Sequence, residues 1–165
     1  MNRDRDENLK KGKKYCLRLL ASRPRSEYEI ETRLKSSGYA DTERGRILEE
    51  LKNAGYVDDL EFAKEWISSR MRSNPRGARL LAEELKSKGV PENIIRKALT
   101  IKSGDIDERQ VVLELVRGGL RTAGSSPEVK LKAKLYRTLI RKGFDPEIIE
   151  DIVTSEVRVQ DHEFE

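Results

Sequence analysis

Leu85-Lys86-Ser87-Lys88-Gly89-Val90 is one of four copies of a phrase in which a leucine is followed by three mostly polar residues, a glycine and an apolar residue. The other copies are Leu34–Tyr39, Leu51–Tyr56 and Leu139–Phe144. The phrase predicts a helix end, because glycine adopts the left-handed backbone conformation at little cost and the apolar residue after it packs back onto the leucine. We therefore expect a chain of helices that end at defined glycines.

Three of these glycines, Gly38, Gly89 and Gly143, lie about fifty residues apart, which indicates an internal helical repeat. No segment alternates polar and apolar residues with the two-residue period of a half-buried strand. The predicted fold class is all-α, with three tandem three-helix repeats. Each repeat is too small to bury a large core alone, so stacking of the repeats predicts an elongated and curved molecule.

The composition of the segments gives the expected domain boundaries. We predict a flexible charged tail at 1–12, repeats at 13–57, 58–104 and 105–154, and an acidic tail at 155–165. Ser26 with Glu29 forms a predicted capping box, and Asp58 with Glu61 is predicted to start another helix. Further starts are predicted at Asn74-Pro75, Ser126-Pro127 and Asp145-Pro146, and a break at Gly118-Gly119.

Composition excludes several classes of protein. Charged residues make up 39% of the 165 residues and aromatic residues 5%, which predicts thin cores and an ionic surface. The single cysteine, Cys16, cannot form an internal disulfide and is predicted to pack in a core. The chain has no apolar stretch of the roughly 18 to 20 residues that a membrane span requires and no signal peptide, so we expect a cytoplasmic protein.

The sequence offers no arrangement typical of an enzyme. The only histidine, His162, stands among acidic residues without a nearby serine or cysteine nucleophile. The pair Asp58-Asp59 is better explained as a helix cap than as a metal site. The glycines follow helices and not strands, which argues against a phosphate-binding loop. We predict a protein without catalytic activity, cofactor or metal.

Basic charge is concentrated in one predicted helix. Residues 117–142 carry eight Lys and Arg against one acid, a net charge of +7, whereas 143–165 have a net charge of −7. Lys130, Lys134, Arg137 and Arg141 fall within about 60° of one another at 100° per residue, opposite an apolar arc. This stripe predicts contact with phosphates or acidic protein surfaces; the alternative is a merely solvated face. Lys132 projects into the arc and must reach the edge of a cleft.

A second group of cations surrounds the predicted turn at Asn74-Pro75. It consists of Arg70, Arg72, Arg76 and Arg79. Arginine suits bidentate recognition of phosphate or carboxylate, although Glu83 is placed to neutralise part of the group. Trp66 is predicted to lie in a core, with base stacking as the less favoured alternative.

In the order of its motifs the chain resembles the bacterial RecX family. The resemblance is carried by Arg23-Pro24-Arg25-Ser26-Glu27, Gly55–Asp59 with Phe62-Ala63, Arg70, Gly77, Glu84-Leu85, Lys88–Val90, Lys132, Lys134, Arg137 and Arg141–Phe144. It extends from about Tyr15 to Val153. Lys142 departs from the arginine that commonly precedes the glycine in this family.

The resemblance implies a non-enzymatic regulator that binds the RecA recombinase and its filament on single-stranded DNA. Such a protein inhibits ATP hydrolysis, strand exchange and co-protease activity, by binding in the filament groove or by blocking filament extension. We expect a monomer. The candidate residues for contact with RecA or DNA are Arg25, Arg70, Arg72, Arg76, Arg79, Lys88, Lys130, Lys132, Lys134, Arg137, Arg141 and Lys142. The alternatives are an autonomous nucleic-acid-binding helical protein and a helical-repeat adaptor that binds no nucleic acid.

Overall fold

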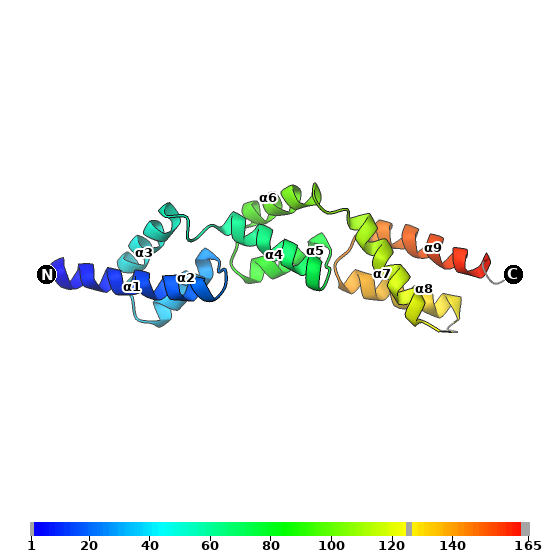
Figure 1. The fold of residues 1–165 in the computed structure, drawn as a ribbon, viewed down its shortest axis with the longest axis horizontal. Coiled ribbons are helices and arrows are strands. Elements are labelled where there is room, and N and C mark those ends of the chain that lie inside the picture. Colours follow the sequence, from blue (N-terminus) through cyan, green and yellow to red (C-terminus); the bar gives the residue numbers. More distant parts are fainter. Residues whose placement is uncertain (1, 125–126, 163–165) are drawn as a thin grey trace. The chain divides into compact units, whose positions relative to one another are not determined.

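The computed structural model describes residues 2–124 and 127–162, and every regular element within these two ranges is an α-helix (Figure 1). The helices are α1 (Asn2–Ser22), α2 (Glu27–Ser36), α3 (Asp41–Asn53), α4 (Asp59–Ser73), α5 (Ala78–Ser87), α6 (Glu92–Ser103), α7 (Glu108–Thr122), α8 (Glu128–Arg141) and α9 (Pro146–His162). The predicted all-α class is confirmed.

The chain forms two compact units, and the boundary between them crosses the middle three helices. Unit 1 extends to Trp66 and includes Glu84–Ala98. Unit 2 contains Ile67–Glu83 and the chain from Leu99 onward. Each of the helices α4, α5 and α6 therefore contributes residues to both units.

All four leucine-to-glycine phrases end helices as predicted. Gly38, Gly55, Gly89 and Gly143 have φ values of 86°, 75°, 75° and 83°. In each copy the N–H of the apolar residue donates to the leucine carbonyl five residues earlier, over 2.9 to 3.3 Å. This is the hydrogen-bond pattern of the Schellman motif, and it satisfies carbonyls that the helix end would otherwise leave unpaired.

The core of unit 1 lies among α1, α2 and α3. Its buried residues are Leu9, Cys16, Ile30, Leu34, Ile47, Leu48, Leu51 and Val57. Complete burial of Cys16 confirms its predicted core position. The expectation of a flexible charged tail at 1–12 is wrong for this part of α1, because Leu9 is buried and a Cβ on Gly12 would lie 2.5 Å from the Cδ1 of Ile47. Residues 5–8, 10 and 11 are exposed, whereas Leu9 and Gly12 are buried against the rest of the unit.

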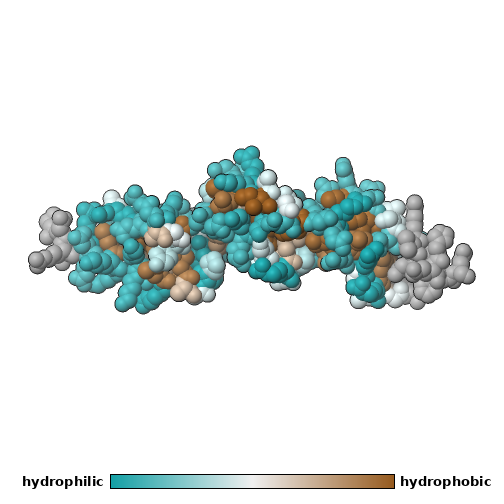
Figure 2. Space-filling model, turned by 45° about the horizontal axis from the view of Figure 1, so that its top comes forward, coloured by the Kyte–Doolittle hydropathy of each residue, from teal (hydrophilic) through white to brown (hydrophobic). Residues whose placement is uncertain are grey.

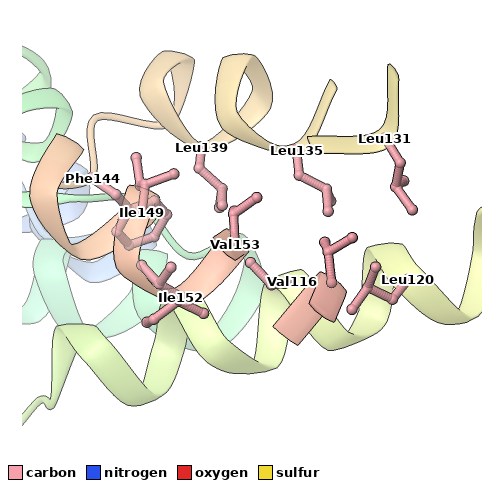
Figure 3. Close-up of a cluster of buried hydrophobic side chains, with 11 residues drawn as sticks. Val116, Leu120, Leu131, Leu135, Leu139, Phe144, Ile149, Ile152 and Val153 are labelled. Carbon is pink, nitrogen blue, oxygen red and sulfur yellow. The ribbon is translucent and has the colours of Figure 1, made fainter. Parts of the chain in front are cut away.

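The core of unit 2 lies among α7, α8 and α9 (Figure 3). Leu131, Leu135 and Leu139 of α8 point toward α7 and α9, where Val116 and Ile149 are fully buried. The predicted break at Gly118-Gly119 is absent, since α7 continues through both residues. A Cβ on Gly119 would lie 2.5 Å from Leu135, so this glycine permits close packing of α7 and α8.

The predicted helix starts divide into confirmed and incorrect ones. The capping box of Ser26 and Glu29 is present, and Asp58 accepts the N–H groups of Leu60 and Glu61 at 2.8 and 3.0 Å. Asp145 caps α9 in the same way. The start predicted at Asn74-Pro75 is wrong. Helix α5 begins only at Ala78, with the Gly77 carbonyl accepting its first helical hydrogen bond. Ser126 lies outside the described residues, and Pro127 occupies the N-cap of α8.

The start of one repeat's second helix contacts the glycine stop of the next repeat's second helix, and this contact occurs twice. In unit 1 the buried Ser26 hydroxyl donates to the Lys88 carbonyl at 2.6 Å, and Tyr28 covers Gly89. In unit 2 the Gly77 N–H donates to the Lys142 carbonyl at 2.8 Å. A hydroxyl donor in the first contact is thus replaced by a backbone donor in the second.

The C-terminal end also differs from the predicted tail. Helix α9 continues to His162, and Val157 is buried against the core of unit 2, so the segment from 155 is not simply an acidic tail. The side chains of residues 158–162, His162 among them, lie outside the described part of the structure. Hydrophilic residues cover most of the face shown in Figure 2, with hydrophobic patches between them.

Candidate binding surface on helix α8

The cationic stripe of α8 is exposed along its length. Lys130, Lys134, Arg137 and Arg141 are all exposed and lie on the side of the helix away from its buried leucines. Among the described residues, no acidic side chain forms an ion pair with any of the four. Arg137 donates through Nε only to the Ala133 carbonyl of its own helix, at 3.2 Å. The stripe is therefore a concentrated positive charge that an external anion is free to approach.

Lys132 is held differently from the stripe. Its side chain is partly buried and forms an ion pair with Glu128 one turn earlier. It lines a groove between α8 and α9, as its position in the apolar arc predicts. Because a carboxylate already accompanies this ammonium group, Lys132 contributes less net positive charge to the surface than its exposed neighbours do.

The arginine group around 70–79 is only partly a surface feature. Arg72 and Arg79 are exposed, whereas Arg70 and Arg76 are half-buried. Arg79 pairs with Glu83 at 3.0 Å, as expected, and also donates to the Ile140 carbonyl at 3.0 Å. Arg79 is therefore committed to contacts within unit 2.

Lys142 belongs to the same intramolecular contact. Its Nζ donates to the Asn74 side chain at 2.7 Å and lies 3.4 Å from the Pro75 carbonyl. Burial lowers the pKa of Lys142, and the charge of nearby Arg76 lowers it further. This geometry explains why Asn74 does not cap a helix, since its side-chain oxygen accepts from Lys142.

The two candidates in unit 1, Arg25 and Lys88, also make contacts inside the protein. Arg25 is half-buried and donates from Nε to the Leu19 carbonyl at 3.3 Å. The Lys88 ammonium lies 5.1 Å from the ring centroid of Trp66 and 3.7 Å from Glu29. Trp66 donates from Nε1 to Glu84 at 2.8 Å and stacks with Phe62. Trp66 is therefore held by structural contacts, but it is only partly buried and stands outside the fully buried core that was predicted for it.

The aspartate pair has two separate structural tasks. Asp58 caps α4, while Asp59 accepts the backbone N–H of Glu27 at 2.8 Å. The contacts of Asp59, Ser26 and Gly77 across repeats were not foreseen. One signal was available in the sequence: Ser26 precedes Gly38 by the same number of residues as Gly77 precedes Gly89, so the two residues occupy equivalent positions in successive repeats. No group of three His, Cys, Asp or Glu side chains within the described residues is arranged to hold a metal ion.

A hollow of about 580 Å³ in unit 1 is lined by apolar residues and by carboxylates. The apolar residues include Leu17, Leu20 and Phe62, and the carboxylates are those of Asp58, Glu61 and Glu65. Asp58 is occupied as a cap and Glu61 pairs with Lys64, so neither is poised as an acid or base. None of the described helices has the length and apolar character needed to cross a membrane.

The apolar arc of α8 is divided into a buried part and an exposed part. Leu131, Leu135 and Leu139 are buried, but Val129 is 78% exposed and Tyr136 is 36% exposed. The width of the arc in the sequence was the available signal, because a helix of this kind buries only part of its circumference against a core. The exposed apolar residues lie beside the cationic stripe on the helical wheel.

Three family descriptions match successive segments of the chain. "RecX, first three-helix domain" matches residues 13–51, "RecX, second three-helix domain" matches 58–99, and "RecX, third three-helix domain" matches 107–153. These matches confirm the predicted organisation into three tandem three-helix domains.

Curated relatives and solved structures agree with this result. The regulatory protein RecX of Mycolicibacterium smegmatis is 39% identical over 153 residues, which cover 88% of this chain and 79% of the relative. Its counterpart from Mycobacterium tuberculosis is 32% identical over 161 residues, covering 93% and 90%. A crystal structure of RecX from Lactobacillus salivarius has the same fold, with a TM-score of 0.82, 20% identity and coverage of 93% and 99%. The sequence resemblance is thus confirmed, and the chain belongs to the RecX family of regulatory proteins.

Proposed function

We propose that this protein binds the RecA recombinase and its filament on single-stranded DNA, and inhibits ATP hydrolysis, strand exchange and co-protease activity by binding and not by catalysis. Membership of a family of regulatory proteins supports this proposal. The observation that carries it is the exposed stripe of Lys130, Lys134, Arg137 and Arg141, which has no acidic partner among the described residues.

A filament presents the same surface many times, so a chain built from repeats gains from several weak contacts at once. When one contact is made, the others form at a high effective concentration. Binding to successive protomers would then block extension or occupy the filament groove. The remaining candidates stay proposed contact residues, and each combines such a role with interactions inside the protein; they are Arg25, Arg70, Arg72, Arg76, Arg79, Lys88, Lys132 and Lys142.

The decisive experiment measures recombinase ATP hydrolysis on single-stranded DNA at substoichiometric amounts of this protein. We expect inhibition well below one molecule per recombinase protomer. Simultaneous reversal of Lys130, Lys134, Arg137 and Arg141 to Glu should weaken inhibition and leave helicity unchanged. The matched control reverses Lys10, Lys14, Arg96 and Lys97, which are also exposed and change the net charge by the same amount.

Two outcomes would contradict the proposal. Equal loss of inhibition in both variants would mean that overall charge matters and the stripe does not. Absence of any effect on the recombinase, together with tight binding of the free protein to an oligonucleotide, would favour the autonomous nucleic-acid-binding alternative. For four phosphate contacts, that alternative predicts a slope of roughly −3 in a plot of log affinity against log salt concentration.

A further inference from the structure

A shallow groove of about 400 Å³ lies between α8 and α9 within unit 2. Its apolar lining includes Val129, Tyr136 and Val153, and its edges carry Lys132, Arg137 and Glu150. Only Val153 of the three apolar residues is buried in the core of the unit. The groove is thus an apolar surface that the three-helix packing of unit 2 leaves uncovered.

The exposed residues of this groove are unusual for the chain. Val129 and Tyr136 are two of the five large apolar side chains that stand well exposed among the described residues. Scattered single apolar residues need no explanation, but an apolar strip with a charged border is typical of a protein-binding surface. Tyrosine in particular supplies a large contact area at low cost in conformational entropy.

The two sides of the groove differ in charge. On the α8 side, Lys134, Arg137 and Arg141 border Tyr136 along a second, adjoining hollow. On the α9 side the exposed Glu150 lines the groove, and the exposed Glu147 lies outside the lining, three residues earlier on the same helical face. A ligand lying in the groove therefore meets positive charge along one edge and negative charge along the other.

We infer that this groove binds an amphipathic polypeptide segment, which seats an apolar side chain beside Tyr136 and turns its carboxylates toward the cationic stripe of α8. A phosphodiester chain fits less well, because it is anionic along both edges and would lie against Glu150. Tyr136 is the one aromatic side chain in the lining of this groove, and Val129 and Val153 beside it are aliphatic and offer bases no further stacking surface. The inference rests on the proposed function in one respect, namely that the partner bound at this face is a protein and not DNA.

Designed peptides test the charge asymmetry directly. Two helical peptides of equal length share one leucine stripe; the first has Glu along one edge and Lys along the other, and the second has Glu along both edges. Fluorescence anisotropy with the full-length protein should show tighter binding of the first peptide. Glu150→Lys should shift the ratio of the two affinities toward the second peptide by about fivefold or more. An unchanged ratio would overturn the charge assignment.

Surface variants test the apolar contact. Tyr136→Ser and Val129→Ser should each weaken binding of the first peptide, Tyr136→Ser by about tenfold, while helicity is retained. Tyr56→Ser is the matched control, because Tyr56 is 55% exposed and belongs to unit 1. It should leave peptide binding unchanged. Equal binding of a peptide with the same composition and a scrambled order would show that charge alone acts, and would overturn the inference.

The same variants distinguish other occupants. Binding of a twenty-nucleotide oligo(dT) should be unaffected by Tyr136→Ser. A loss as large as that for the peptide would identify nucleic acid as the occupant. Concentration-dependent dimerisation of the wild type in sedimentation velocity that disappears in Tyr136→Ser would identify a second copy of the chain; either result overturns the inference. A peptide preference without recombinase inhibition would refute the proposed function alone, whereas inhibition without a peptide preference would refute only the present inference.

Discussion

The carboxylate of Asp59 accepts the backbone N–H of Glu27 at 2.8 Å, which joins the first residue of α4 to the first residue of α2. Glu27 in turn pairs with Lys52 at 2.8 Å. The first N–H groups of a helix have no partner within the helix, so Asp59 satisfies a donor of α2 from the neighbouring repeat. A residue that the sequence places in a local cap thereby holds two repeats together.

Two replacements of Asp59 should separate the contribution of its hydrogen bond to stability from the contribution of its charge. Asp59→Ala removes the acceptor of the Glu27 N–H and should lower the free energy of unfolding by about 1–2 kcal/mol. Asp59→Asn keeps an oxygen acceptor and should cost less. Urea denaturation at pH 7 measures both. Equal losses for the two variants would show that the hydrogen bond contributes nothing measurable.

The same pair of variants has a defined pH dependence. Burial raises the pKa of Asp59 above its ordinary value of 3.8, and the Glu27 N–H offsets only part of this shift. The folded protein therefore holds the proton more tightly than the unfolded chain does. The resulting stabilisation is complete below pH 3.8 and is lost as the pH rises through the folded pKa. Asp59→Asn does not titrate, so its stability relative to the wild type should increase across this window and then stay constant. A decrease would contradict the assigned direction.

Gly77 should not tolerate a methyl group. A Cβ at this position would lie 2.1 Å from the Gly143 carbonyl oxygen, which is a backbone atom that cannot simply rotate away. We expect Gly77→Ala to destabilise unit 2 by about 2–4 kcal/mol. Gly45→Ala is the control, because nothing lies within 4 Å of the added Cβ in α3. It should raise stability by up to about 1 kcal/mol. Similar effects of the two changes in thermal denaturation would contradict the close backbone contact.

Replacement of Lys88 should affect stability but not inhibition, and replacement of Lys134 should affect inhibition but not stability. Lys88→Met removes the ammonium group from Trp66 and Glu29 and should lower the stability of unit 1 by about 0.5–1 kcal/mol, without affecting recombinase inhibition. Lys134→Met should weaken inhibition without changing stability. The fluorescence of Trp66, the only tryptophan, reports unfolding of unit 1 directly. Loss of inhibition by Lys88→Met at unchanged stability would place Lys88 at the partner surface instead.

Cys16 should be chemically silent in the folded protein. The thiol is completely buried, and burial raises its pKa to about 11, so the reactive thiolate is almost absent at neutral pH. Its reaction with a disulfide reagent such as DTNB should be slow and should accelerate sharply across the urea transition of unit 1. Rapid labelling in the absence of urea would show that α1 opens readily.

The positions of helix ends were largely predictable because their causes are local. A leucine, a glycine and an apolar residue within six positions contain all the groups of a Schellman stop, and all four copies form one. The capping box at Ser26 follows for the same reason. The helix start predicted at Asn74-Pro75 was wrong because the Asn74 side chain accepts a hydrogen bond from Lys142, a contact distant in sequence that no local pattern reveals. The helix break predicted at Gly118-Gly119 was wrong because close packing of α7 against Leu135 outweighs the low intrinsic preference of glycine for a helix.

The sequence by itself determined the all-α class, the helix stops and the cationic stripe of α8, since each depends on residues within a few turns of one another. Only the tertiary structure decided which cations are available. Arg79 and Lys142 bond to backbone and side-chain oxygens more than sixty residues away, whereas Lys130 and Lys134 are exposed and form no ion pair with an acid in the described structure. Such pairings depend on how the helices pack against one another. Packing is set by buried leucines such as Leu135 and Leu139, and the sequence pattern of these leucines does not reveal which charged side chains the packing brings close together.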